Sequence, residues 1–263
     1  MLKKIIALTL AILMVATCLT ACKKYATLDS VKKAGKLVIA TSPDFPPFEN
    51  LNDDGSVTGI EIEIMELICE KLGVELEIQQ MDFNAVLPGI QSGKYDVGVS
   101  GISVTPEREK NVLFTTPYCL AAQAIVVLEG SDITGKADLT GKKISVQSGT
   151  TAEDYCTSEG YSIDAYEANA AAQMALTTGK VAAWVIDDLT AAEMVAAYNA
   201  ENPETKLVIL DEAMTTEPYA FAFNQGSKDL VDEINKILEE LISDGTVAAL
   251  FEEYGAPYTS PNK

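Results

Sequence analysis

The chain has 263 residues, enough for one large domain or two modest ones, and 39 acidic against 19 basic residues give it a net charge of −20. This charge repels nucleic acid and anionic lipid surfaces, so neither is expected as a partner. The chain contains no histidine, which excludes catalytic triads that use this residue.

The N-terminus has the plan of a secretory signal. Lys3 and Lys4 precede an apolar run over residues 5–15, which is too short to span a bilayer comfortably. The run is followed by Leu19-Thr20-Ala21-Cys22, which resembles the lipobox of bacterial lipoproteins. The resemblance implies that residues 1–21 are removed and that a lipid on Cys22 anchors the chain to the outer face of the cell membrane. A chance cysteine beside an ordinary cleavage site is the alternative.

Three cysteines remain beyond Cys22, namely Cys69, Cys119 and Cys156. They form no Cys-x-x-Cys pair and have no histidine to act with, so neither a metal site nor a cofactor is expected. A structural disulfide is possible, although nothing in the sequence demands one.

The first half of the chain alternates between strand and helix patterns. Residues 22–35 are polar and predict a tether behind the lipid. After them the expected elements are a strand over 37–41, a proline-rich loop over 42–48, a helix over 61–72 ended by Gly73, a strand over 75–80, a short helix over 85–91 and a strand over 95–99. Such alternation is typical of a parallel α/β layer.

A second α/β layer follows in the other half. It begins after residues 112–115 and a long apolar strand over 121–128. Its predicted strands are 142–147, 162–166, 181–186 and 206–210, with helices over 151–158 and 170–178 and a third helix that follows Asp188 and runs to Tyr198. An apolar strand over 219–223 and helices over 229–241 and 246–254 end the chain. The last strand and the two closing helices are left over from the second layer, so we expect them to complete the first. The predicted lobes are 36–121 with 220–256, and 122–219. Two strands would cross between them, near 121–124 and 219–221, and residues 257–263 would form a tail.

The stretch from Gly98 to Arg108 contains the only arginine of the chain. A guanidinium can grip a planar carboxylate with two parallel hydrogen bonds, which an ammonium cannot do. Ser100, Gly101 and Ser103 precede it with hydroxyls and backbone N–H groups that could complete an anion site. A solvated surface arginine is the alternative.

Other loops follow the carboxyl ends of predicted strands, where ligands of open parallel sheets bind. They are 42–48, 81–83, 100–108 and 147–151, and Asp187 follows a fifth strand. Together they complement an amino acid zwitterion, with its carboxylate at Arg108, its ammonium at Asp187 and its side chain between Phe45 and Phe83.

Each of these residues also has a structural interpretation. Phe45 and Phe83 could belong to the core. Asp187 could be a helix N-cap, although Asp188 is the residue that we assign to that role. Ser148 and Thr150 could also serve only as capping groups.

With these features the chain resembles a known family, the extracellular solute-binding proteins of polar amino acid ABC transporters (family 3 type, lipoprotein form). The resemblance covers about residues 36–254. It rests on Ile39-Ala-Thr-Ser-Pro-Asp-Phe-Pro-Pro-Phe-Glu49, Met81-Asp-Phe83, Leu87-Pro-Gly-Ile-Gln-Ser-Gly-Lys-Tyr-Asp96, Ser100-Gly-Ile-Ser-Val-Thr-Pro-Glu-Arg108, Val146-Gln-Ser-Gly-Thr150 and Val185-Ile-Asp187. It implies an α/β, two-lobe fold of the periplasmic-binding-protein type II, in which two mixed sheets are joined by two hinge strands.

The resemblance also implies roles at the site. Arg108 would hold the α-carboxylate with Ser103 and the amide of Thr150, while Ser100 and Asp187 would hold the α-ammonium. Phe45 and Phe83 would sandwich the side chain, and Gly101 would let the backbone approach. Ser42 and Gln147, which would contact the side chain, are neutral, so the prediction is a neutral or polar amino acid. Asp44 or Glu49 could add a charge there, but the sequence does not show their direction.

The predicted function is capture of a free L-amino acid by a monomer that closes about its hinge and delivers the ligand to an ABC permease. The chain has no Gly-x-x-x-x-Gly-Lys-[Ser/Thr] motif for hydrolysing ATP itself. The alternative from another class is a secreted dehydratase of the same fold that acts on a cyclic carboxylate. Its acid would be Glu217.

Overall fold

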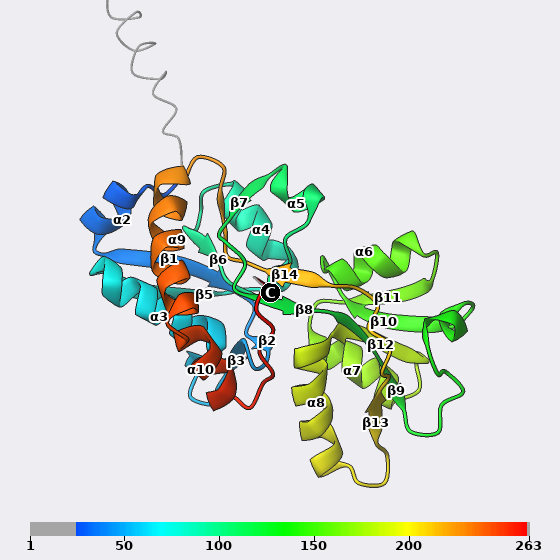
Figure 1. Cartoon of the computed structure of the whole chain (residues 1–263). Coiled ribbons are helices and arrows are strands. Elements are labelled where there is room, and N and C mark those ends of the chain that lie inside the picture. The colour runs from blue at the N-terminus through cyan, green and yellow to red at the C-terminus, as the bar shows by residue number, and fades with distance from the viewer. Residues whose placement is uncertain (1–24, 262–263) are drawn as a thin grey trace, which may run out of the picture.

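The computed structural model describes residues 25–261, which form two α/β lobes (Figure 1). Each lobe is built on a five-stranded sheet, with strand order β5-β1-β6-β15-β7 in the first and β11-β10-β12-β9-β13 in the second. The predicted signal sequence and the lipidation residue Cys22 lie outside the described residues. The two-lobe fold class expected from the sequence is therefore correct.

The first sheet consists of a parallel part and an antiparallel part. β1 (Lys36–Thr41) runs parallel to β5 (Glu75–Gln80) on one side and to β6 (Val97–Gly98) on the other. β15 (Ala222–Asn224) comes from the far end of the chain and pairs antiparallel with β6 and with β7 (Val112–Phe114). The intervening helices are α3 (Ile60–Leu72), α4 (Phe83–Gln91) and the short α5 (Pro106–Glu109), and a small sheet of β2 (Asp44–Phe45), β3 (Glu49–Leu51) and β4 (Val57–Thr58) precedes α3.

The second sheet has the same mixed character. β10 (Lys143–Gln147) is parallel to β11 (Ser162–Tyr166) and β12 (Ala183–Asp187), whereas β9 (Gln123–Leu128) is antiparallel to β12 and to β13 (Leu207–Ile209). Every residue of β12 is buried, because strands flank it on both sides and helices cover the sheet. Those helices are α6 (Thr151–Ser158), α7 (Asn169–Thr177) and α8 (Asp188–Glu201), with the 3₁₀ helix η1 (Lys136–Leu139) before β10.

A two-stranded ladder connects the lobes. β8 (Cys119–Ala121) pairs antiparallel with β14 (Glu217–Tyr219), so that Glu217 lies opposite Ala121. The sequence predicted one continuous strand over 121–128 and another over 219–223, and both predictions of continuity are wrong. Each stretch is divided into a hinge strand and a sheet strand, because the chain leaves the ladder to join a lobe.

The expected tether over residues 22–35 is wrong for its second half, which forms helix α2 (Leu28–Ala34). Thr27 and Ser30 make a reciprocal capping box, and Gly35 ends the helix with a φ of 70°. Val31 is buried, and the Leu28 N–H donates to Asp229 of α9 over 3.0 Å. The sequence did not predict this helix, because Val31 is its only buried residue and the two lysines of its last turn made the segment look polar.

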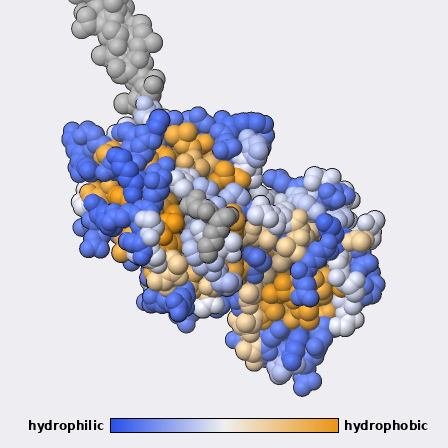
Figure 2. Space-filling model, viewed as in Figure 1, coloured by the Kyte–Doolittle hydropathy of each residue, from blue (hydrophilic) through white to orange (hydrophobic). Residues whose placement is uncertain are grey.

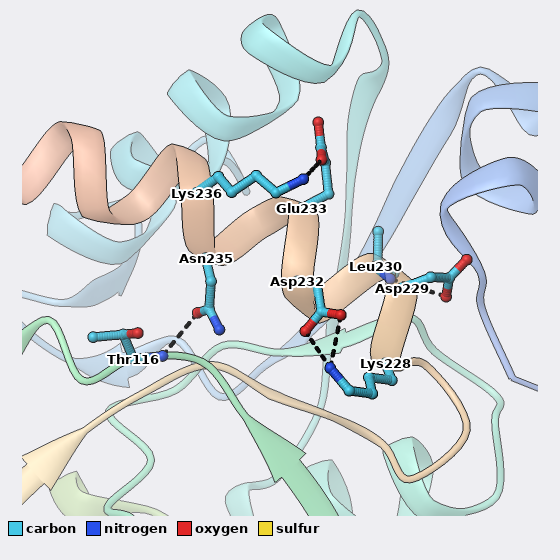
Figure 3. Close-up of polar contacts among 8 residues, drawn as sticks. All are labelled: Thr116, Lys228, Asp229, Leu230, Asp232, Glu233, Asn235 and Lys236. Carbon is cyan, nitrogen blue, oxygen red and sulfur yellow. Dashed lines mark hydrogen bonds and ion pairs between the residues drawn. The ribbon is translucent and has the colours of Figure 1, made fainter.

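The closing helices α9 (Lys228–Ser243) and α10 (Thr246–Glu253) lie on the first lobe beside α3, as expected (Figure 1). α9 buries Leu230, Ile234 and Leu238 on one face, and each such side chain contributes about 1.5–3 kcal/mol. Asn235 of α9 accepts a hydrogen bond from the Thr116 N–H over 2.8 Å, just before the hinge, while the Lys228–Asp232 and Lys236–Glu233 pairs lie along the exposed side (Figure 3).

Hydrophilic residues cover much of the outward surface of both lobes (Figure 2). Within residues 25–261, no helix combines the length and apolar character needed to cross a membrane. Cys69, Cys119 and Cys156 are buried free thiols, so the disulfide that the sequence left open does not form.

Candidate ligand-binding site

A narrow pocket, called the cavity below, lies between the lobes and next to the hinge. All ten residues that the sequence predicted as ligand-binding line this cavity, together with two more, Asp44 and Thr151. The lining residues are Ser42, Asp44, Phe45, Phe83, Ser100, Gly101, Ser103, Arg108, Gln147, Thr150, Thr151 and Asp187. The structure therefore brings the predicted set together, while the individual roles stay predictions.

The sheets explain this convergence. β1, β6, β10 and β12 end on the side of the cavity, so the loops after them and Asp187 at the end of β12 lie close together. Phe83 differs from the expected loop position, because it is the first residue of α4. Thr151 was missed as a lining residue since it reads as an ordinary first helical residue behind the cap Thr150.

Arg108 extends from α5 into the wall of the cavity. Its Nη1 donates to the Ser103 carbonyl over 3.0 Å and its Nη2 to the Gly149 carbonyl of the other lobe over 3.1 Å. The guanidinium also lies 5.7 Å from the centre of the Phe83 ring, within cation–π range. Burial lowers the pKa of Arg108, whereas the charge of Glu217 opposes that effect, and the group remains a cation at neutral pH.

Gly101 allows a close approach that no other residue could make. Its φ of 53° is left-handed, and a Cβ there would lie 2.4 Å from Cε1 of Phe45. Phe45 itself stacks on Phe48 with ring centres 5.6 Å apart and is only 8% exposed. The ring is thus mainly a core side chain, and the part that remains free faces the cavity.

Asp187 provides a buried carboxylate on the other side. It occupies the N-cap position of α8, but its side chain makes no capping hydrogen bond. Instead, Oδ1 accepts from the Tyr219 hydroxyl over 2.5 Å and from Gln123 Nε2 over 3.0 Å. Burial first, and then the charge of Glu217, raises the pKa of Asp187 to about 7.

Asp188 is not the N-cap that the sequence suggested. It is the first residue of α8, and its carboxylate accepts hydrogen bonds from the N–H groups of Ala122 and Leu189. The sequence could not separate the two adjacent acids, because the choice depends on where β12 ends.

A polar cluster forms the end of the cavity opposite Arg108. Asp44 accepts hydrogen bonds from Ser42 Oγ over 3.0 Å and from the Asn169 N–H over 2.8 Å, and Gln147 Nε2 lies 3.4 Å from both of its oxygens. Since Ser42 and Asp44 belong to one lobe and Gln147 and Asn169 to the other, this cluster also bridges the lobes. Burial raises the pKa of Asp44, and the hydrogen bond from Asn169 opposes that rise.

Glu217 lies at the hinge behind the wall of the cavity. Its Oε2 accepts from Ser103 over 2.5 Å and from Thr151 over 2.6 Å, and its Oε1 accepts from Thr215 over 2.8 Å. All three of these hydroxyl groups donate to the Glu217 carboxyl group, which therefore acts as a hydrogen-bond acceptor. It is not placed as a proton donor toward the cavity, which weakens the dehydratase alternative.

The family model of the bacterial extracellular solute-binding proteins, family 3, matches residues 37–257. The chain belongs to this family. The family assignment covers both lobes and the hinge, and it places the protein outside the cytoplasm.

Relatives of this solute-binding protein support the same assignment. The L-cystine-binding protein TcyJ of Escherichia coli (strain K12) is 30% identical over 237 residues, covering 88% of this chain and 87% of the relative. The arginine-binding extracellular protein ArtP of Bacillus subtilis (strain 168) is 30% identical over 251 residues, with 92% and 96% covered. Holo ArgBP from T. maritima superposes with a TM-score of 0.76 at 35% identity, with 87% of this chain and 99% of that chain covered.

Proposed function

We propose that the protein captures a free L-amino acid in the cavity between its lobes and delivers it to an ABC permease in the membrane. The observation that carries the proposal is that one guanidinium, Arg108, and one buried carboxylate, Asp187, both lie in the wall of the same cavity. This arrangement complements the zwitterion that all amino acids share.

The α-carboxylate would bind at Arg108. Ser103 and Thr150 lie beside it, but the Ser103 hydroxyl donates to Glu217 and the Thr150 hydroxyl donates to the Gln147 carbonyl over 2.7 Å. The hydroxyl of Ser103 is therefore available only as an acceptor or after rearrangement, and the amide of Thr150 is the better donor for an anion. The α-ammonium would bind at Asp187, where a cation favours the ionised carboxylate, with Ser100 next to it.

The ligand's side chain would lie between Phe45 and Phe83 and point toward Ser42, Asp44 and Gln147. Ser42 and Gln147 favour a neutral or polar side chain, as predicted from the sequence. Asp44 adds a half-buried acceptor, so we propose a side chain that donates hydrogen bonds, whether as a neutral amide or as a cation.

Hinge closure would accompany binding. The Arg108–Gly149 and Asp44–Asn169 hydrogen bonds join groups of opposite lobes, so they can form only when the lobes are together. A ligand that contacts both lobes binds the closed state better than the open one and shifts the population toward it. We also propose a monomer without catalytic activity that is held at the outer face of the membrane by a lipid on Cys22.

A thermal-shift screen with the twenty L-amino acids and L-cystine tests this function. A ligand at 100 times its Kd stabilises the folded state by about 2.7 kcal/mol, which is a readily measured shift in Tm. The D-enantiomer of each hit is the control, because it cannot place its ammonium, carboxylate and side chain at the same three groups. No stabilisation by any L-amino acid, together with turnover of a cyclic carboxylate, would establish the dehydratase alternative instead.

A further inference from the structure

Two acidic residues meet in the core directly beneath the loop proposed to bind the ammonium. Glu49 of β3 and Glu61 of α3 are both 0% exposed, and their carboxyl groups hydrogen-bond to each other. Within residues 25–261, neither is among the acids that form an ion pair with a lysine or arginine. Two negative charges in contact without a cation would be very costly in the interior, so the pair must keep a proton.

The hydrogen bonds show which residue carries that proton. Glu61 accepts at both oxygens, from the Tyr118 hydroxyl over 2.6 Å and from the Gly101 N–H over 2.8 Å, as an ionised carboxylate does. Glu49 accepts only at Oε1, from the Ser100 hydroxyl over 2.8 Å, while its buried Oε2 has no donor. A proton on Oε2 of Glu49, donated to Glu61, satisfies both groups.

The same hydrogen bonds hold the site. Ser100 Oγ accepts from the Ser42 N–H over 3.0 Å and donates to Glu49, while the Gly101 N–H is fixed by Glu61. Ser42, Ser100 and Gly101 all line the cavity. The two carboxyl groups touch no part of the cavity themselves, yet they determine where three of its lining residues lie.

We propose that Glu49 and Glu61 form a one-proton carboxyl pair that positions the Ser100–Gly101 loop, so that ligand affinity falls when the pair loses its proton. The inference rests on the proposed amino acid site and adds a regulation of it by pH. Both acids act as positioning residues, since they reach the ligand only through the loop.

Burial and the neighbouring negative charges favour keeping the proton, whereas the hydrogen bonds from Ser100, Tyr118 and Gly101 oppose this effect. Burial raises the pKa of Glu61 and, together with the charge of Glu61, raises that of Glu49 well above the ordinary value. The charge of Asp44 on β2 acts in the same direction on Glu49. Tyr118 and Cys119 are neutral, because burial raises the pKa of each well above its ordinary value.

Two isosteric variants test the proton's position. In Glu49→Gln the amide N–H replaces the proton donated to Glu61, so affinity near neutral pH should stay within about threefold of the parent protein. In Glu61→Gln the amide N–H faces the N–H of Gly101 or the hydroxyl of Tyr118, so affinity should fall about tenfold or more. Glu66→Gln, on the exposed side of the same helix, is the control and should bind like the parent.

The pH profile separates positioning from a merely structural role. The ratio of parent affinity to Glu49→Gln affinity, measured by calorimetry from pH 5 to 9, should fall as the pH rises, because only the parent has a proton to lose there. Asp187 and the ligand titrate equally in both proteins and cancel in this ratio. A constant ratio, or equal losses in the Glu49 and Glu61 variants, would overturn the inference.

A ligand-free measurement keeps this test independent of the proposed function. Because the folded-state pKa of Glu49 lies above its unfolded value, the parent loses stability as the pH rises above about 4.5, and Glu49→Gln lacks this contribution. Urea unfolding of both proteins without ligand measures it. If no amino acid binds the parent, the proposed function fails, while identical unfolding profiles of parent and Glu49→Gln would refute the proton pair itself.

Discussion

The two ends of the cavity differ in how much freedom the protein leaves them. At one end Arg108 has a fixed guanidinium, held by two backbone carbonyls from opposite lobes. At the other end Ser42, Asp44 and Gln147 bond to one another by side-chain contacts, two of which are 3.4 Å long. The first end suits the part of the ligand that all amino acids share, whereas the second suits the part in which they differ.

The largest effect is expected from Arg108→Lys. An ammonium keeps the charge but cannot make two parallel hydrogen bonds, so affinity should fall by about 2–3 kcal/mol, roughly 30- to 150-fold, for every ligand that binds. Calorimetry measures it, with Lys110→Ala at an exposed ion pair with Glu107 as the control. An unchanged Kd in Arg108→Lys would show that the carboxylate does not bind there, and the contrast between the two ends would be lost.

The pH dependence of binding should reveal Asp187. Its pKa of about 7 means that the ligand-free carboxyl is largely protonated below that pH, and ammonium binding requires the ionised form. Affinity should therefore rise by up to about tenfold per pH unit below pH 7, and this contribution of Asp187 should level off above it. Without ligand the sign reverses, and stability falls as the pH rises from about 3.8 to 7. Asp187→Asn should flatten both profiles, and an unaltered slope in that variant would assign the titration to another group.

Gly101→Ala probes the wall of the cavity. The added Cβ would approach the Phe45 ring in a left-handed backbone, which should cost about 1–3 kcal/mol of stability and also weaken binding. Gly130→Ala is the matched control, because its φ of 82° is equally left-handed but nothing lies within 4 Å of the new Cβ. Urea unfolding of both variants measures the difference in stability. Equal losses of stability in the two variants would show that the Phe45 ring moves aside without a free-energy cost.

The smallest effect is expected from Asp44→Asn, which tests directly whether the second end of the cavity distinguishes between ligands. A neutral polar ligand should change its affinity less than about threefold, whereas a cationic ligand should lose about tenfold, because a charged hydrogen bond is replaced by a neutral one. Competition between one neutral and one cationic ligand would measure this change. If both ligands lose affinity alike, Asp44 acts through Ser42 and Asn169 and not on the ligand.

Much of this architecture could be predicted from the residues alone. The order of strands and helices follows from local patterns, and a unique arginine after a buried strand indicates an anion site. The residues of the cavity were also predictable, since the carboxyl ends of parallel strands meet at one edge of a sheet. Local patterns failed where an element depends on a distant partner. The α2 helix has local caps, but its packing on the first lobe includes a hydrogen bond to the distant Asp229, and the division of the crossing strands depends on the hinge ladder.

The sequence by itself determined the family, the two-lobe fold and the residues that surround the cavity, because these are encoded in short continuous stretches. Only the tertiary structure decided whether Asp187 or Asp188 lines the cavity, and only it turned Asp44 toward the cavity. It also made Glu217 the acceptor of hydrogen bonds from three hydroxyl groups. It also brought Glu49 and Glu61 together in the core. The physical reason is the same in each case. The charge and protonation of a carboxyl group depend on which donors and acids surround it, and those neighbours come from segments far apart in the chain.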